Sequence, residues 1–221
     1  MKILNTKLRI VDQTIVIYHF NKNKNNEKNN KKEREKKMSR YDVIIIGAGP
    51  GGIFAAYELA KKASELKVAV FEAGNSLEKR KCPIDGKKIK SCINCKTCAI
   101  MSGFGGAGAF SDGKYNITND FGGTLYEYIG KDTAIDLMKY VDEINLAYGG
   151  EGTKMYSTAG TDIKKLCSQN ELKLLDASVR HLGTDINYIV LENLYKELKE
   201  KVEFRFNYRV DELEAVDGGY R

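Results

Sequence analysis

The sequence YDVIIIGAGPGGIFAAYELAKKASELKVAVFEA, residues 41–73, places two short apolar runs around a glycine-rich turn and a helical pattern. The first run, residues 43–46, is rich in β-branched side chains, and the second, residues 68–71, ends on Glu72. Strand, glycine turn, helix, strand and acidic residue follow in the order of a dinucleotide-binding βαβ unit. These residues predict an α/β fold with a parallel sheet of Rossmann type.

Each glycine of the turn has a mechanical reason in such a unit. Gly47 allows a tight turn out of the strand, Gly49 leaves the backbone open to a pyrophosphate, and Gly52 allows close packing of helix on strand. The first amides of the helix lack intrahelical acceptors and lie at its positive end, so they bind phosphate. The predicted cofactor-binding residues of this turn are Gly47, Gly49, Pro50, Gly51 and Gly52.

Glu72 lies 20 residues after Gly52, where a carboxylate accepts hydrogen bonds from the ribose hydroxyls of a dinucleotide. The same negative charge repels a 2′-phosphate, so FAD or NAD is favoured over NADP. A glycine turn that binds no nucleotide is the alternative, and the complete flanking pattern disfavours it.

Composition places the chain among ordinary soluble proteins, since 42% of its 221 residues are hydrophobic and 30% are charged. Residues 1–40 hold 12 Lys and Arg against 4 Asp and Glu, whereas the remainder holds 24 against 26. The body is therefore near neutral and gives no argument for a nucleic-acid partner.

No apolar run approaches the ~20 residues of a membrane helix. Five cysteines, four of them clustered, do not resemble a secreted disulfide framework, so we expect a cytoplasmic protein with no membrane partner.

Residues 1–38 are predicted to be a disordered or spurious N-terminal extension. An apolar stretch at residues 15–18 precedes an Asn- and Lys/Glu-rich run that has too few apolar side chains to form a core. A basic arm that binds nucleic acid or an anionic surface, or an organelle transit peptide, are the alternatives. We expect Met38 to be the natural start, because the first strand follows directly.

A second glycine-rich block, SGFGGAGAFSDGK, occupies residues 102–114. So many glycines predict backbone that lies against a flat ligand or adopts special dihedral angles. A flexible loop is the alternative, which the interleaved Phe104, Ala107, Ala109 and Phe110 disfavour.

Three later helices are expected at residues 132–148, 162–175 and 185–201. The first has Ile135, Met138, Val141, Asn145 and Tyr148 on one side and ends at Gly149 and Gly150. The second has Thr161 as its N-cap and Cys167 on a core-facing side. The third carries the apolar residues Val190, Leu191, Leu194 and Leu198.

The alternating residues 202–206 predict a strand, and residues 209–220 predict a hairpin with its turn at residues 217–219. The chain stops one residue later, so this hairpin lacks its partner strand and we expect a truncated sequence.

From residue 39 to residue 221, the chain resembles the family of uncharacterised FAD-dependent dehydrogenases. The shared pieces are DVIIIGAGPGG at 42–52, FEAG at 71–74, KCPI at 81–84, SGFGGAGAFSDGK at 102–114 and RHLGTD at 180–185. The resemblance implies the N-terminal part of an FAD-binding domain, with residues 74–184 as an inserted or flanking region. It also implies that the strand at 202–206 joins the sheet in parallel, and that a late Gly-Asp motif lies beyond Arg221.

The resemblance further implies which residues contact FAD. The second glycine block would line the pyrophosphate or the isoalloxazine through Gly105, Gly106, Ala107 and Gly108, and Val210 would lie against the adenine. The implied activity is hydride transfer between the flavin and a small-molecule substrate, with NAD(P)H, another carrier or oxygen as electron partner. A non-catalytic or inactive partial nucleotide-binding module is the alternative. An NAD-only dehydrogenase is disfavoured because it leaves the second glycine block without a role.

Two further groups of residues stay open. Cys82, Cys92, Cys95 and Cys98 have the ligand count for zinc or an iron–sulfur cluster, but a redox thiol pair or incidental cysteines also fit. No metal ligands are assigned. His181 could donate a proton to substrate or flavin, although a hydrogen-bonded loop histidine is the simpler interpretation. No catalytic residue is assigned.

Overall fold

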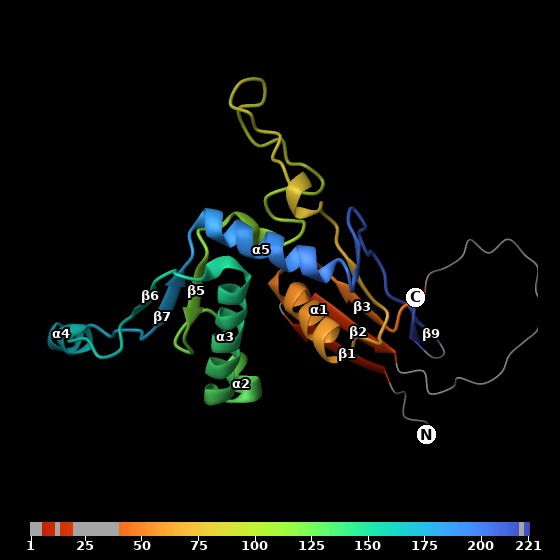
Figure 1. Ribbon diagram of the computed structural model, residues 1–221. Helices are drawn as coiled ribbons and strands as arrows, with labels where there is room; N and C mark the ends of the chain where they lie inside the picture. Colours follow the sequence, from red (N-terminus) through yellow and green to blue (C-terminus); the bar gives the residue numbers. More distant parts are fainter. Residues whose placement is uncertain (1–5, 12–13, 20–39, 217–218) are drawn as a thin grey trace, which may run out of the picture. The chain divides into compact units, whose positions relative to one another are not determined.

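The computed structural model describes residues 6–11, 14–19, 40–216 and 219–221 (Figure 1). They divide into two compact units, Met1–Gly108 with Lys196–Arg221, and Ala109–Tyr195. The second unit begins and ends later than the inserted region expected at residues 74–184, and the assignment of domains to functions stays a prediction. No helix of the described residues is long and apolar enough to cross a membrane.

The first unit is built on a five-stranded mixed sheet with the order β1-β2-β3-β4-β8. The three strands β3, β4 and β8 run parallel, whereas β1 and β2 are antiparallel additions. The strands are β1 (Thr6–Val11), β2 (Thr14–His19), β3 (Val43–Ile46), β4 (Val68–Phe71) and β8 (Glu203–Arg205). The predicted strands at 43–46 and 68–71 are confirmed, and the strand expected at 202–206 joins the sheet in parallel beside β4.

Helix α1 (Pro50–Lys62) connects β3 to β4 and packs on β2, β3 and β4. It starts with proline at its first position, where the missing amide costs no hydrogen bond, and ends on Lys61 and Lys62, whose charges suit the C-terminal dipole. Its face toward the sheet is apolar, since Ile53, Ala56, Tyr57 and Ala60 are all buried. Strand, helix and parallel strand therefore form the expected Rossmann-like βαβ unit.

The N-terminal extension differs in part from the expectation of disorder. Residues 6–11 and 14–19 form β1 and β2, and β2 pairs with β3 from Ile15 opposite Ile46 to Tyr18 opposite Val43. The apolar residues 15–18 fall within β2, because β-branched residues favour a strand beside an open sheet edge. Residues 20–39 lie outside the described residues, so the expected start at Met38 stays a prediction.

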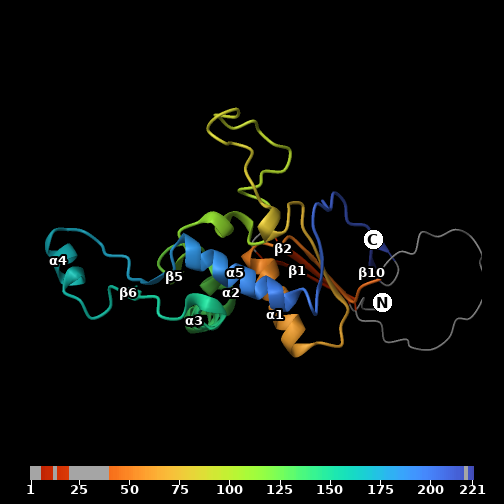
Figure 2. The same cartoon turned by 45° about the horizontal axis from the view of Figure 1, so that its top comes forward.

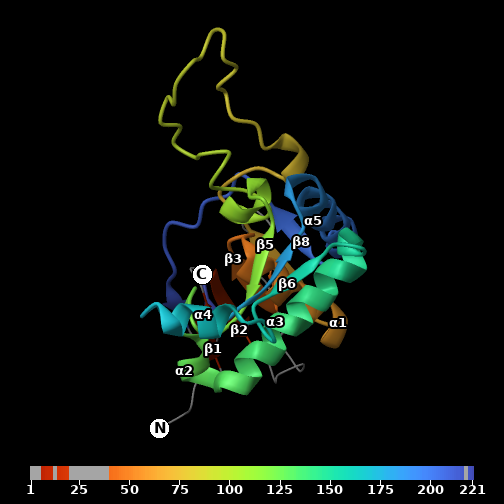
Figure 3. The same cartoon turned by 90° about the vertical axis from the view of Figure 1, so that its left-hand side faces the viewer.

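The second unit contains a small antiparallel sheet that the sequence analysis missed. Its strands are β5 (Lys114–Ile117), β7 (Ser178–His181) and β6 (Met155–Ser157), in the order β5-β7-β6. Helix α3 (Lys131–Asn145) packs on β5, as Figure 3 shows, and α2 (Leu125–Ile129) precedes it. Helix α4 (Ile163–Gln169) lies at the tip of the long excursion from β6 to β7 (Figure 2).

Two helix predictions need correction. Helix α3 buries Ala134, Asp142, Ile144 and Asn145, whereas four of the five residues predicted to face the core are only half-buried. The buried face includes Asp142, whose carboxylate pairs with Arg180, as described below. The helix is followed by a π-type turn, Leu146–Gly150, in which Gly149 has φ +125°, so its expected glycine ending is confirmed.

Helix α4 stops at Gln169, well before residue 175, and Asp162 rather than Thr161 stands at its N-cap position. None of its residues is buried, so no packing extends it, and Cys167 is half-buried rather than in a core. Helix α5 (Thr184–Leu198) buries Val190, Leu191, Leu194 and Leu198 as predicted. The division between the two units falls within it.

The C-terminal hairpin also needs correction. Strand β9 (Ala215–Val216) pairs with β10 (Gly219–Tyr220), and the backbones of Glu214 and Arg221 bond to each other in both directions. The returning strand begins at Gly219, within the expected turn, so the partner strand that was predicted to be missing is present as Gly219–Tyr220.

Candidate dinucleotide site

The turn between β3 and α1 has the geometry that its glycines predicted. Gly47 has φ +96°, and its amide donates to the Phe71 carbonyl at 2.8 Å. A Cβ on Gly52 would lie 2.0 Å from the Gly47 carbonyl oxygen, so only glycine fits there. A Cβ on Gly49, in contrast, would meet nothing within 4 Å. The turn is tightly packed toward the protein and open on the side of Gly49.

The start of α1 is suited to an anion. Gly49 is the N-cap residue and supplies no side-chain hydrogen bond, and the first turn contains no acidic residue. The amides of Gly51 and Gly52 belong to the first turn, where no intrahelical acceptor is available. The helix dipole adds positive potential at the same place. A pyrophosphate over Gly49 would meet these amides without displacing any side chain.

Glu72 is bound more tightly than the sequence analysis expected. Its side chain is buried, and its carboxylate accepts hydrogen bonds from the amides of Ala48 (2.7 Å), Gly74 (2.7 Å) and Gly103 (2.9 Å). These three amides belong to the first glycine turn, the end of β4 and the second glycine block. A carboxylate offers about four acceptor positions, so about one remains for a ribose hydroxyl. Glu72 is first of all a clamp, and its predicted contact with ribose stays a prediction.

Arg80 is a functional candidate that the sequence analysis missed. It is 6% exposed, and its guanidinium donates to four backbone carbonyls, those of Ala99, Ile100, Phe104 and Gly106, at 2.7–2.9 Å. Burial lowers the pKa of Arg80, and the charge of Glu72 acts in the opposite direction. In the sequence Arg80 stands between two lysines, and nothing in that pattern distinguishes the buried cation from its solvated neighbours.

The second glycine block lies directly on the first. The buried Gly105 donates its amide to the Ala48 carbonyl at 2.8 Å, and a Cβ on Gly106 would lie 3.1 Å from the Cα of Gly49. Gly105 and Gly106 have φ +87° and +58°, so both adopt the left-handed region that favours glycine. The structure thus brings the two glycine-rich motifs, more than 50 residues apart, into one continuous backbone surface.

The remaining predicted contacts are less closely tied to this surface. Ala107 is exposed, and a Cβ on Gly108 would meet nothing within 4 Å, so both have room for a ligand. Val210 is half-buried in the loop after β8. That loop is fixed at the end of β4, because the amides of Asn207 and Tyr208 donate to the carbonyls of Gly74 and Glu72. A contact between Val210 and adenine stays a prediction.

The motif at residues 180–185 has a structural role within the second unit. Arg180 is buried, its Nε donates to Asp142 at 2.6 Å, and its Nη1 donates to the Thr153 carbonyl. Leu182 and Gly183 donate their amides to the carbonyls of Gly113 and Asp112. His181 is exposed at the end of β7, so its predicted role as a proton donor has no further support.

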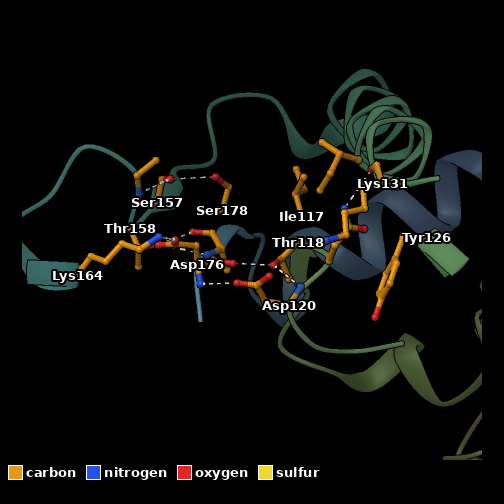
Figure 4. Close-up of a pocket in the computed structure, with 14 residues that line it drawn as sticks. Ile117, Thr118, Asp120, Tyr126, Lys131, Ser157, Thr158, Lys164, Asp176 and Ser178 are labelled. Carbon is orange, nitrogen blue, oxygen red and sulfur yellow. Dashed lines mark hydrogen bonds and ion pairs between the residues drawn. The ribbon is translucent and has the colours of Figure 1, made fainter. Parts of the chain in front are cut away.

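A hollow of about 630 Å³ lies within the second unit (Figure 4). It is polar, but its carboxylates are engaged: Asp176 pairs with Lys164 at 2.6 Å, and Asp120 accepts from the Asp176 amide. The Thr118 hydroxyl donates to the Asp176 carbonyl, as Figure 4 shows. These contacts stabilise the excursion between β6 and β7, and no histidine or thiol lines the hollow. It offers hydrogen-bonding groups for a ligand, and its two carboxylates are already bound by groups of the protein.

Comparisons with known proteins identify the same βαβ unit. Residues 28–78 match the model of the Thi4 family. A stretch of 38 residues is 55% identical to a thiamine thiazole synthase from Yarrowia lipolytica, and it covers 17% of this chain and 12% of that enzyme. The family match includes β3, the glycine turn, α1, β4 and Glu72, and it ends before the second glycine block. The similarity therefore supports a flavoprotein-like nucleotide-binding unit.

Proposed function

We propose that the chain binds FAD and serves an FAD-dependent oxidoreductase that transfers a hydride between a small-molecule substrate and the flavin. The observation that carries the proposal is the joining of two glycine-rich blocks into one backbone surface at the start of α1. A mononucleotide-binding βαβ unit needs only the first block. The second block extends the surface beyond the pyrophosphate position, which suits a longer flavin dinucleotide.

The residues that would hold FAD can be named from this surface. The pyrophosphate would lie over Gly49 at the amides of Gly51 and Gly52, and the ribose at the free acceptor position of Glu72. The flavin side would lie along Gly105, Gly106, Ala107 and Gly108, and the adenine near Val210. When bound, the flavin supplies the hydride chemistry of the reaction.

The protein itself supplies position and charge. Glu72 and Arg80 both bind the backbone of the second glycine block. Glu72 accepts a hydrogen bond from the Gly103 amide, and Arg80 donates to the carbonyls of Phe104 and Gly106. Both side chains are buried, so the second glycine block is fixed without any regular secondary structure. The Arg80 cation also lies beside the Gly106 carbonyl, near the place assigned to the negative pyrophosphate.

The partners follow from the same reasoning. NAD(P)H, another carrier or oxygen would exchange electrons with the flavin, and the substrate would be a small molecule. A nucleic-acid or membrane partner has no support in the charge of residues 41–221. We propose a cytoplasmic location on the same grounds as in the sequence analysis.

The alternative is a non-catalytic or inactive nucleotide-binding module. It fits the same turn, because a dinucleotide fold by itself does not specify a reaction. The similarity to a thiamine thiazole synthase covers only 38 residues, 12% of that enzyme, so it does not extend that enzyme's reaction to this chain.

A titration of the purified full chain with FAD, NAD and NADP tests the proposal. FAD should bind and raise the melting temperature. Gly49→Ala should weaken FAD binding by more than about tenfold, ~1.4 kcal/mol, because its methyl group fills the pyrophosphate position. Its melting temperature without FAD should not change, since the site is open and φ is −73°. Ser64→Ala, near the other end of α1, is the matched control and should bind FAD normally.

Two outcomes would count against the proposal. A chain that neither binds FAD nor gains stability from it contradicts FAD binding. A chain that binds FAD, but whose flavin exchanges no electrons with NAD(P)H or oxygen, supports the non-catalytic module instead.

A further inference from the structure

The segment between Arg80 and the second glycine block carries four cysteines that line one hollow of about 280 Å³. It belongs to the first unit and is drawn as the long yellow loop in Figure 1. The other lining residues are Pro83, Ile84, Ile93, Asn94 and Ala99, so no carboxylate or imidazole borders the space. Cys82 and Cys98 are half-buried, and Cys92 and Cys95 are exposed. The donor set of this hollow is therefore purely thiol.

The backbone of the loop bends around these thiols. Residues 80–100 form no helix or strand, and such long ordered loops are commonly functional. Asn94 adopts φ +51°, and its amide points at the Cys92 sulfur at 3.5 Å. Amide hydrogen bonds to sulfur are one of the means by which proteins tune iron–sulfur centres. The turn between Cys92 and Cys95 thus already presents a donor to a ligating sulfur.

The spread of the four thiols argues against a preformed site for a single ion. Zinc binds four thiolates at about 2.3 Å, which draws the sulfurs together around one point. Among the described residues, no three His, Cys, Asp or Glu side chains are gathered closely enough to hold one metal ion. Four cysteines around an open space instead match a polynuclear group, whose own atoms separate its ligands.

The spacing of the cysteines and the charge of the loop also favour a cluster. Cys92, Cys95 and Cys98 form a Cys-x₂-Cys-x₂-Cys run, the spacing of three consecutive ligands in bacterial ferredoxins, and Cys82 comes from a separate part of the loop. The loop also carries five lysines, which would balance the negative charge of four thiolates and their cluster: Lys81, Lys87, Lys88, Lys90 and Lys96. We infer that Cys82, Cys92, Cys95 and Cys98 bind a [4Fe–4S] cluster.

The position of the site links it to the second glycine block. The carbonyl of Cys98 accepts the amides of Met101 and Ser102, and the next two carbonyls, of Ala99 and Ile100, are bound by Arg80. A cluster would therefore order the chain that leads directly into this block. The assignment rests on the cysteine loop alone and does not require FAD to bind.

Anaerobic reconstitution of the full chain with ferrous iron and sulfide tests the inference. We expect about four iron and four sulfide per chain, with visible absorption that bleaches on addition of dithionite. Cys95→Ser should lose most of the iron and sulfide and keep its melting temperature without metal, because Cys95 is exposed and outside both sheets. Cys167→Ser, in the second unit and not among the residues that line the hollow, is the control and should assemble the cluster fully.

Several results would overturn the assignment. These are binding of about one zinc ion without sulfide, no metal after reconstitution, or equal iron and sulfide in wild type and Cys95→Ser. The FAD site is tested separately, because Gly49→Ala should retain the cluster whether or not it binds FAD. A chain that binds FAD but no cluster contradicts the cluster assignment alone. A chain that binds the cluster but no FAD contradicts the proposed FAD site alone.

Discussion

The Oε1 atom of Glu72 accepts a hydrogen bond from the Gly103 amide at 2.9 Å, although 31 residues separate the two in the chain. The same oxygen binds the Gly74 amide, and Oε2 binds the Ala48 amide. A Cβ on Gly74 would lie 2.4 Å from the Gly103 nitrogen, so the two backbones touch beneath the carboxylate. One buried acid thereby connects the end of β4 to both glycine-rich blocks.

Replacement of this acid should disturb all three segments at once. Glu72→Gln replaces one carboxylate oxygen with a donor that faces an amide, so at least one buried amide loses its acceptor. We expect the free energy of unfolding to fall by about 1–3 kcal/mol and FAD binding to weaken. Urea unfolding with and without FAD measures both effects.

Glu65→Gln is the control for this prediction, because Glu65 is exposed between α1 and β4. It should change neither quantity. Equal unfolding curves for Glu72→Gln and wild type would contradict the clamp role of Glu72.

The role of Glu72 shows how far the sequence could predict this site. Its position after β4 follows from the motif, because 20 residues of turn, helix and strand separate it from Gly52. Its contact with Gly103 does not, because a loop of irregular backbone has no periodicity that reports where it returns. Arg80 was missed for the same reason, since burial of a cation depends on carbonyls that only the folded loop gathers.

Gly52→Ala should destabilise the first unit strongly. The new methyl group would lie 2.0 Å from the Gly47 carbonyl oxygen and 3.3 Å from the Ile45 side chain, so α1 must move away from β3. We expect the free energy of unfolding to fall by about 1–3 kcal/mol or more, the typical cost of overpacking. Thermal unfolding by circular dichroism measures it.

Gly108→Ala is the matched control, because a Cβ there meets nothing within 4 Å. If Gly52→Ala melts at the same temperature as Gly108→Ala, the close packing of α1 on β3 is wrong.

The buried pair of Arg180 and Asp142 gives a prediction for the second unit. Asp142→Asn removes the negative charge but leaves Arg180 buried, which should cost about 3–5 kcal/mol. Limited proteolysis between residues 109 and 195 should show faster cleavage, with little change in residues 40–108. Asp136→Asn, an exposed acid on the same helix, should leave the cleavage rate unchanged.

The second unit was harder to predict than the first for a physical reason. Strands β5, β6 and β7 are three or four residues long and mostly polar or half-exposed, so they lack the apolar alternation that indicates a strand. The sheet is attached to α3 by the ion pair of Arg180 in β7 with Asp142, a contact between residues 38 apart that no periodicity indicates. The long helices α3 and α5 were predictable because their apolar residues repeat at helical spacing.

The ion pair at the polar hollow predicts a pH effect with a definite sign. The hydrogen bond from Lys164, then that from Thr158, lowers the pKa of Asp176 below its ordinary value. A carboxyl whose pKa is lower in the folded state stabilises that state above its unfolded pKa, and the contribution is lost as pH falls through the folded pKa.

Lys164→Met should therefore raise the pKa of Asp176 toward its ordinary value, with the Thr158 bond retaining part of the shift. Carboxyl-carbon NMR titration measures this pKa directly, and Lys165→Met, which leaves Lys164 in place, should not change it. An Asp176 titration that is identical in Lys164→Met and wild type would show that the pair at 2.6 Å does not form in solution.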